Sequence, residues 1–258
     1  MISKLIILGC GSSVGVPRID GFWGLCKKKN RKNSRTRCSA IIIKGKNSVL
    51  IDTSPDIKQQ LLSNKIKNIS SVIFTHEHAD QTNGLFELRP FFWMHKKRIN
   101  VYGNSKTINE LKKRQDYLFI NKSGYPPIVK SNIIKQNLTL GKGSEKIYFD
   151  TFNAKHGKTS SVVYIFEKTA YISDANDLSI IHNKKLHKLN CLIIDCLKYD
   201  KHPSHYNLKD VLFINSHLKP KKTILTNLHH DIDYGFLKHK LPKNIIPAYD
   251  GLKINLKK

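Results

Sequence analysis

Short apolar runs typical of β-strands recur along the whole chain. They are rich in Ile, Val, Leu and aromatic residues and occupy residues 4–9, 39–45, 48–53, 70–75, 99–103, 146–152, 161–167, 169–174, 191–195 and 222–227. Other stretches place their apolar residues at helical spacing, namely 56–64, 107–119 and 208–218. A helix is also expected to begin within 84–92 and to end or bend at Pro90. Residues 123–132, with their Pro-Pro pair, indicate an irregular connection.

These strands come in groups with helices set between them, which shapes the expected architecture. The arrangement predicts two sheets packed face to face with helices outside, an α/β (α+β) protein in four layers of the type αββα. The chain has 258 residues, and one large α/β domain takes roughly 200–250 residues. Because neither a composition shift nor a repeat marks a boundary, residues 1–258 are interpreted as a single domain.

Composition narrows the class of protein. No apolar stretch reaches the roughly 20 residues that a membrane span needs. The first residues, MISKLIILGCG, contain a short apolar run without a small-residue cleavage site, so they are interpreted as a first strand and a cytoplasmic location is expected. The five cysteines are odd in number and form no C-x-x-C pair. Cys10, Cys191 and Cys196 lie in or beside apolar strand runs, so buried thiols are expected there rather than a disulfide scaffold.

The net charge of +26 has two interpretations. Such a field attracts polyanions, but lysines scattered over the whole chain are also what a generally lysine-rich surface produces, and this second interpretation is favoured. The densest cluster, KKKNRKNSRTR at 27–37, is either a solvated loop or a rim that faces a phosphate.

The stretch THEHADQ at 75–81 carries the strongest chemical signal. Two imidazoles two residues apart, His76 and His78, point to the same side of an extended or tight-loop backbone and can converge on one cation. Asp80 continues the spacing with a carboxylate, and zinc accepts both imidazole nitrogen and carboxylate oxygen. The stretch follows a buried strand, at the end where sites in α/β proteins open. A metal site is therefore predicted here.

This stretch and several others make the chain resemble the metallo-β-lactamase fold family. The similarity is greatest to its phosphodiesterase branch, which includes phosphoribosyl cyclic phosphate phosphodiesterase and tRNase Z. It covers nearly the whole chain and rests on segments that follow the family's order: LGCGSSVGVPR, LIDTSPD, THEHADQ, the HG at 156–157, AYISDA, HPSHYNL, LTNLHHDIDY and PAYDG.

The resemblance implies a set of metal ligands. His76, His78 and His156 would bind a first zinc ion, Asp174 would bridge two metals, and Asp80 would belong to the second metal and count among the catalytic residues. A further aspartate would support the metal loop from behind, as metal ligands must be held in their orientation. This residue is Asp52.

The family pattern is broken at two positions. Gln81 and Asn227 stand where the family has histidines, and both missing imidazoles would serve the second metal. Three outcomes follow: an oxygen-rich second site for a harder cation such as manganese or magnesium, replacement of a lost ligand by His229, or a single zinc ion. The favoured expectation is Zn²⁺ at the first site and a weaker second divalent metal, Zn²⁺ or Mn²⁺. Loss of catalysis altogether is the fourth outcome and is not favoured.

The resemblance also implies a mechanism, in which a metal-bound hydroxide attacks phosphorus. A histidine in HPSHYNL would protonate the leaving oxygen; His205 matches best and His202 is the alternate. Asn207 is a candidate helix cap. Arg89 and Arg18 are candidates for binding the phosphate, although each could equally be a structural ion-pair partner.

Three functions compete on these grounds. The favoured one is a metal-dependent phosphodiesterase for a small, perhaps cyclic, phosphate diester. A tRNase Z-like endonuclease is less favoured because no long Gly/Pro-containing arm is found, and a non-catalytic nucleic-acid-binding relative must explain why the metal set persists. The expected partner is thus a small phosphorylated substrate, with nucleic acid not favoured, no membrane, and a homodimer left open. The lone Cys26 argues against a cysteine-rich zinc site near the N-terminus.

Overall fold

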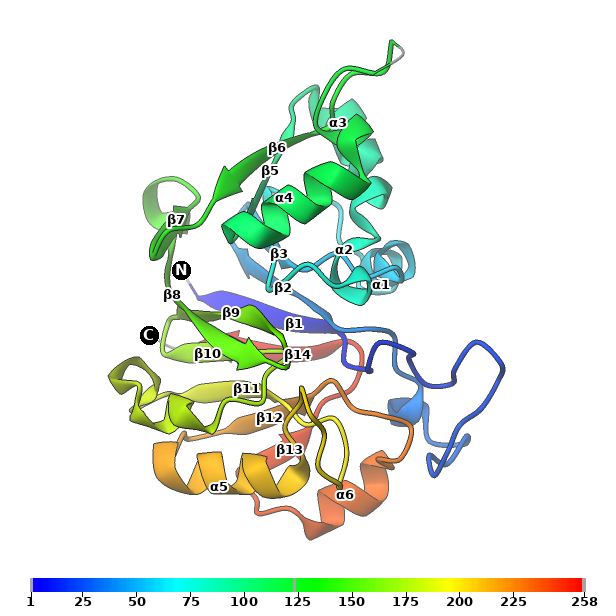
Figure 1. The fold of residues 1–258 in the computed structure, drawn as a ribbon, viewed down its shortest axis with the longest axis vertical. Coiled ribbons are helices and arrows are strands. Elements are labelled where there is room, and N and C mark those ends of the chain that lie inside the picture. Colours follow the sequence, from blue (N-terminus) through cyan, green and yellow to red (C-terminus); the bar gives the residue numbers. More distant parts are fainter. Residues whose placement is uncertain (1, 123, 257–258) are drawn as a thin grey trace.

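Two seven-stranded sheets form the centre of the protein. The computed structural model describes residues 2–122 and 124–256. The first sheet has the strand order β14-β1-β2-β3-β4-β5-β6, and it extends from the middle of Figure 1, at β14 and β1, towards the top, at β5 and β6. Its strands are β14 (Leu252–Leu256), β1 (Ser3–Gly9), β2 (Ser39–Lys44), β3 (Asn47–Ile51), β4 (Ser71–Ile73), β5 (Ile99–Gly103) and β6 (Val129–Ile133).

The second sheet repeats this plan with different strands. Its order is β13-β12-β11-β10-β9-β8-β7. In each sheet four neighbouring strands run parallel and the other pairs are antiparallel. The strands are β13 (Ile245–Pro247), β12 (Thr223–Thr226), β11 (Cys191–Asp195), β10 (Thr169–Ile172), β9 (Thr159–Phe166), β8 (Ile147–His156) and β7 (Asn137–Leu140).

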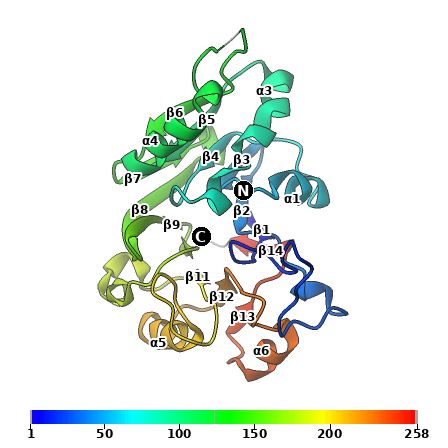
Figure 2. The ribbon, with the colours of Figure 1, turned by 45° about the vertical axis from the view of Figure 1, so that its right-hand side comes forward.

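Helices cover the outer faces of both sheets, as the views in Figures 1 and 2 agree. On the first sheet these are α1 (Ile57–Ser63), α2 (Ala79–Thr82), α3 (Arg89–His95) and α4 (Ser105–Arg114). On the second they are α5 (Leu208–Leu218) and α6 (Tyr234–Lys240). Short 3-10 turns occupy η1 (Arg31–Asn33), η2 (Leu85–Leu88), η3 (Asp116–Leu118), η4 (Gly143–Glu145), η5 (Leu178–His182) and η6 (Lys184–Leu186).

Strand periodicity explains why the sheets are buried on both faces. In β1, Leu5 and Ile7 join the core between the two sheets, whereas Ile6 and Leu8 join the core between the first sheet and its helices. Successive side chains of a strand point to opposite faces, so a continuous apolar run fits a strand that is covered on both sides. The predicted four-layer αββα sandwich is therefore observed.

The parallel strands bring the candidate chemistry to one edge. Strands β3 and β4 are parallel neighbours, and Asp52 and His76 follow their carboxyl ends. In the second sheet β10, β11 and β12 are also parallel, and they are followed or ended by Asp174, Asp195 and Asn227. Because parallel strands end at the same side of a sheet, these side chains are collected at one edge.

Some element predictions were wrong. Pro90 does not end a helix but lies in the first turn of α3, where its missing N–H costs no hydrogen bond. The irregular connection predicted at 123–132 includes strand β6 from Val129 onward, while residue 123 lies outside the described residues. Asn207 does cap α5, since its side chain accepts from the Asp210 N–H. The sequence pattern missed β7, β13, β14 and α6.

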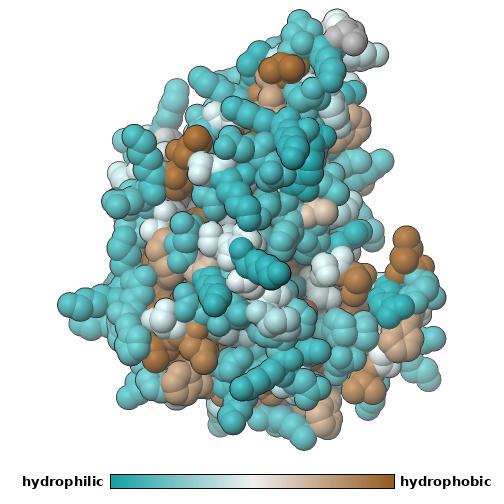
Figure 3. Space-filling view, viewed as in Figure 1, coloured by the Kyte–Doolittle hydropathy of each residue, from teal (hydrophilic) through white to brown (hydrophobic). Residues whose placement is uncertain are grey.

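Residues 10–37 form a long excursion beside the sheets, drawn in dark blue at the right of Figure 1. Figure 3 shows brown, apolar patches on this part of an otherwise mainly hydrophilic face, and the exposed apolar residues of the segment are Val14, Ile19, Phe22 and Leu25.

The basic cluster at 27–37 is partly structural. Arg35 is buried and donates to the carbonyls of His229 and Ile232, and Arg37 pairs with Asp56 at 2.6 Å.

Candidate metal centre

Three imidazole rings converge at the edge where the strands end. The His76 Nε2 atom lies 3.0 Å from His78 Nδ1, and His156 Nε2 lies 3.4 Å from the same His78 atom. Tetrahedral zinc with nitrogen ligands at about 2.0–2.1 Å places those nitrogens roughly 3.3 Å from one another. The three rings are therefore spaced as ligands of one ion would be.

The orientation of His76 is fixed from behind through Thr75. The hydroxyl of Thr75 donates to Asp52 Oδ2 at 2.9 Å, so its oxygen can accept from His76 Nδ1, 3.1 Å away. The Thr75 N–H also donates to Asp52 Oδ1 at 2.8 Å. A proton on Nδ1 leaves the Nε2 lone pair of His76 directed at the other imidazoles, as a metal ligand requires.

His156 is held in the same manner by a different segment. Its Nδ1 lies 2.7 Å from the carbonyl oxygen of Ser204. A carbonyl only accepts, so Nδ1 carries the proton and Nε2 presents its lone pair to the site. The left-handed backbone of Gly157, with φ of 58°, lets the chain turn directly after this ligand.

The electrostatics of the donor set suit a divalent ion. Burial lowers the pKa of His76 to about 3 and also lowers the pKa of His78, so both rings are neutral donors at neutral pH. Burial opposes ionisation of Asp174, but the neighbouring His76, His205 and His156 hold its pKa below its usual value. Three converging imidazoles next to an ionised carboxylate form a ligand set that zinc accepts, and the residues present therefore fit a metal.

Two side-chain amides complete the other half of the site. Gln81 Nε2 lies 3.1 Å from Asp80 Oδ2 and 3.4 Å from Asp174 Oδ2. Asn227 Nδ2 lies 3.1 Å from Asp174 Oδ1. Burial raises the pKa of Asp80 to about 6, and the charge of Asp174 adds to this shift. The structure thus brings both family departures, Gln81 and Asn227, to the same pair of carboxylates.

His205 stands between two carboxylates next to the imidazole cluster. Its Nδ1 lies 2.8 Å from Asp195 Oδ2 and 3.8 Å from Asp174 Oδ1. Its ring centroid is 4.7 Å from that of His156. Burial alone would lower the pKa of His205, but the two carboxylates raise it to about 9. The ring is therefore a cation at neutral pH, with its Nδ1–H donated to Asp195 and Nε2 left as a proton donor.

The imidazole cluster opens into a cavity of about 270 Å³. Predicted residues that line it are His78, Asp80, His156, Asp174, His202, His205, Asn227 and His229, and Ser12, Ser13, Val14, Leu197 and Ser204 complete the described lining. The alternate proton donor, His202, accepts from the Ser204 N–H at 3.4 Å. Neither Lys nor Arg is among the described residues that line the cavity. The positive charge of this cavity therefore comes from histidine.

Two of the predicted residues, both arginines, contact residues outside the cavity. Arg18 pairs with Asp20 at the surface, and the guanidinium of Arg89 lies over the ring of Phe86, 4.4 Å from its centroid. Neither arginine is among the described lining of the cavity, so the structure does not support their assignment to phosphate binding. Both are satisfied by local partners.

His229 reaches the cavity wall but belongs to a different cluster. Its Nδ1 lies 2.8 Å from Asp231, and its ring stacks on that of His230 with centroids 3.6 Å apart. His229, His230 and Asp231 form their own group of potential ligand atoms, separate from those around His76 and Asp174. In this arrangement His229 does not take the place of the missing histidine.

Sequence reasoning missed two residues that orient the site. Asp195, fully buried, holds His205, and the Ser204 carbonyl holds His156. The sequence could have indicated Asp195 as a site residue, because it ends the apolar strand CLIID just as Asp174 follows the strand at 169–172. The Ser204 carbonyl had none, since its role depends on contact between residues that are far apart in the chain.

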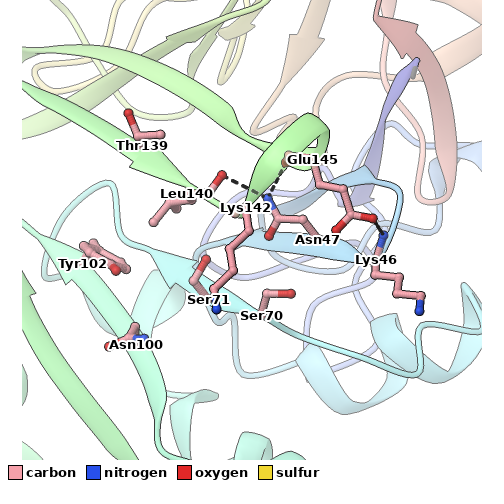
Figure 4. Close-up of a pocket in the computed structure, with 11 residues that line it drawn as sticks. Lys46, Asn47, Ser70, Ser71, Asn100, Tyr102, Thr139, Leu140, Lys142 and Glu145 are labelled. Atoms are coloured by element: carbon pink, nitrogen blue, oxygen red, sulfur yellow. Dashed lines mark hydrogen bonds between the residues drawn. The ribbon is translucent and has the colours of Figure 1, made fainter.

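A larger polar cavity, of about 470 Å³, lies at the opposite ends of β3, β4 and β5 (Figure 4). It is lined by Lys46, Asn47, Ser70, Ser71, Asn100, Tyr102, Thr139, Leu140, Gly141, Lys142 and Glu145. These described residues include no histidine or cysteine. Size alone therefore does not locate the functional site, whereas the convergence of ligand atoms does.

Comparison with known proteins agrees with this geometry. Residues 47–229, which include nearly every residue of the site, match the family model described as the beta-lactamase superfamily domain. The chain belongs to the metallo-β-lactamase superfamily. It is thus a hydrolase of that fold with a His-rich metal site.

Solved structures of similar fold match over nearly the full chain. A new diphosphatase from the PhnP family is 31% identical with a TM-score of 0.84, covering 98% of this chain and 97% of that chain. Zn²⁺-bound PqqB from Methylobacterium extorquens has a TM-score of 0.76 at 15% identity, covering 98% of this chain and 100% of its own. The short form of human tRNase Z has a TM-score of 0.70 at 15% identity, covering 99% and 100%. The last two show the fold alone.

A curated relative carries a different name. The octanoyltransferase of Porphyromonas gingivalis strain W83 is 30% identical over 256 residues, which is 97% of this chain. The chain spans about half the length of that relative, 51%. The activity named for the whole relative is therefore not assigned to this superfamily member.

Among the described residues no helix is long and apolar enough to cross a membrane. All five cysteines are buried and free, as the sequence predicts for Cys10, Cys191 and Cys196.

Proposed function

We propose that this chain is a metal-dependent phosphodiesterase that cleaves a small phosphate diester. The observation that carries the proposal is that His205, held by Asp195, shares one cavity with the three converging imidazoles. A hydrolysed diester needs both an activated water and a proton for the leaving oxygen. This cavity offers a place for each.

The metal ligands proposed for this chain are His76, His78, His156 and Asp174, with zinc as the ion. When bound, a divalent ion at this position would lower the pKa of water and offset negative charge on a phosphoryl group. Asp52, acting through Thr75, keeps the His76 lone pair aimed at that position.

His205 supplies the proton. Because Asp195 accepts from Nδ1, the remaining proton sits on Nε2, from which a leaving oxygen can take it. His202, with its ring centroid 5.1 Å from that of His205, lies on the same wall and is positioned to meet a phosphate oxygen. Asp80 adds a carboxylate near the reacting atoms that can orient water by accepting a hydrogen bond from it.

The size of the cavity favours a small substrate. Pockets for small molecules occupy about 300–1,000 Å³, and the cavity here is about 270 Å³. A diester with one compact substituent fits this volume better than a folded RNA enclosed on several sides. The relative from the PhnP family is named a diphosphatase, which supports hydrolysis of a phosphate-containing substrate. A diphosphate is therefore included among the substrates to be tested.

The decisive experiment is a hydrolysis screen with zinc and with manganese. Its substrates are bis(p-nitrophenyl) phosphate, cyclic nucleotides, ribose cyclic phosphates, a dinucleotide diphosphate and precursor tRNA. The proposal expects cleavage of a small diester and inert tRNA. Activity on diesters with an alkoxide leaving group should be lost in His205→Asn but not in His239→Asn, an exposed histidine of α6. Cleavage of tRNA alone would identify an endonuclease, and binding of nucleic acid without cleavage would identify a non-catalytic relative.

A further inference from the structure

We propose that this chain binds a single divalent ion, because the amide N–H groups of Gln81 and Asn227 take the place of a second one. The inference rests on the metal site of the proposed function but not on its substrate. It selects the mononuclear outcome among those that the sequence leaves open. A second ion would have to lie between Asp80 and Asp174, the two carboxylates outside the imidazole cluster.

Gln81 is the first residue that fills this position. Its side chain is fully buried, and its Nε2 lies between the two carboxylates, 3.1 Å from Asp80 Oδ2 and 3.4 Å from Asp174 Oδ2. An amide nitrogen has two hydrogens and can donate to both carboxylates at once. It therefore does by hydrogen bonding what a cation would do by charge.

Asn227 provides the same donor from the other side. Its Nδ2 lies 3.1 Å from Asp174 Oδ1 and 3.2 Å from the Ser173 carbonyl. The same atom is 3.2 Å from His205 Nδ1, but that ring nitrogen carries the proton donated to Asp195 and cannot accept. Asn227 thus donates its two amide hydrogens to Asp174 Oδ1 and to the Ser173 carbonyl. With the Gln81 contact, each carboxylate oxygen of Asp174 accepts one hydrogen bond from an amide.

The orientation of the Gln81 amide follows from these contacts. Its Oε1 is buried without a hydrogen-bond partner. Turning the amide round would place this oxygen against two carboxylates and remove both donated hydrogen bonds. Leaving one acceptor unpaired costs less than such a repulsion. In the turned orientation only a cation could hold the oxygen in place, so the observed orientation is the one that excludes a second ion.

Charge balance points in the same direction. Asp80 and Asp174 carry two negative charges when both are ionised, and Asp195 is paired with His205. One divalent ion at the imidazole cluster neutralises the first two carboxylates. A second ion would bring two further positive charges to a buried site, without any imidazole ligand of its own. Amide oxygens are weak ligands for zinc.

The test is a count of bound metal after reconstitution. The protein is stripped with a chelator, reloaded with excess Zn²⁺ or Mn²⁺, freed of unbound metal by gel filtration, and analysed for metal per chain by mass spectrometry. We expect one ion per chain for the unchanged protein. The double variant Gln81→His/Asn227→His should bind two, because both missing imidazoles return.

Two controls assign the ions. Gln59→His/Asn109→His adds two histidines at exposed positions of α1 and α4 and should leave the count at one. His76→Asn should remove the single ion of the unchanged protein, which excludes the cluster of His229, His230 and Asp231 as its location. His tolerates the left-handed backbone of Asn227, φ 60°, nearly as Asn does.

Two results would overturn the proposal. One is two ions per unchanged chain, and the other is a count of one that persists in a folded Gln81→His/Asn227→His variant. If the double variant does not fold, Gln81→Glu, which is isosteric, replaces the donor by a carboxylate and should raise the Mn²⁺ count to two. None of these counts depends on hydrolysis, so an inactive protein with one bound ion would refute the substrate assignment and leave this inference standing.

Discussion

The two halves of the metal centre lie at the same edge of the sandwich but present opposite chemistry. Around His76, three imidazoles turn lone pairs towards a common point. Around Asp80, the amides of Gln81 and Asn227 turn N–H groups towards two carboxylates. The imidazole arrangement is suited to binding a cation. In the amide arrangement the carboxylates already accept hydrogen bonds from N–H groups.

The contacts that orient the side chains also differ between the imidazole half, around His76, and the amide half, around Asp80. Each orienting contact found for the imidazole half fixes a tautomer, through Thr75 and Asp52 or through the Ser204 carbonyl. In the amide half the contacts hold donors against Asp174. The comparison teaches that a fold can keep the positions of a site while the residues at two of them decide how many cations it holds.

Removing a ligand of the imidazole half should have the largest effect. His156→Asn is expected to reduce metal affinity and kcat/KM by more than about 100-fold, since loss of an orienting partner alone typically costs 10–100-fold. Metal analysis and diester hydrolysis would measure both. The exposed His187→Asn serves as the control, and retention of metal by His156→Asn would refute the comparison.

Removing the proton donor should reduce turnover but not metal binding. His205→Asn is expected to lower kcat by about 10²–10⁴-fold for a diester with an alkoxide leaving group. The loss should be much smaller for bis(p-nitrophenyl) phosphate, because p-nitrophenolate leaves without protonation. Equal losses for both substrates would show that His205 does not act as the acid.

The partner of this donor should control the pH dependence. Asp195→Asn is expected to reduce kcat by about 10–100-fold and to shift the basic limb of the pH–rate profile to lower pH. The sign follows because Asp195 helps to raise the pKa of His205 to about 9, and the acid is active only while protonated. An unshifted basic limb, measured on the metal-loaded variant, would contradict this coupling.

The smallest effect is expected when the hydroxyl of Thr75, which orients His76, is removed. Thr75→Val preserves shape but removes the hydroxyl between Asp52 and His76. Metal affinity should fall about 10-fold, with little change in kcat once metal is saturating. A competition titration against a chelator measures the affinity, and Thr139→Val, at an exposed position of β7, is the matched control.

Much of this site could be predicted because its residues follow strands. THEHAD comes directly after β4, and Asp174 follows β10, so a strand pattern alone places them at one edge. The two broken positions, Gln81 and Asn227, are also visible in the sequence. The direction in which their amides point is not, because it is set by contacts with Asp80 and Asp174, and Asp174 lies far from both amides in the chain.

Other features escaped prediction for local reasons. Pro90 was assigned to a helix end although its position in the first turn of α3 is equally compatible with its chemistry. The short strands β7 and β13 carry too few residues for a periodic signal. Arg18 and Arg89 were candidates for phosphate binding; in the structure they contact Asp20 and Phe86 and are not among the described residues that line the cavity.

The most direct test of the account is X-ray absorption at the zinc edge of the loaded protein. The account predicts about three imidazole nitrogens with one or two oxygens at about 2.0–2.2 Å and no metal–metal distance near 3.5–4 Å. Sulfur scattering at about 2.3 Å, or a clear metal–metal distance, would contradict the claim that three imidazoles hold a single ion.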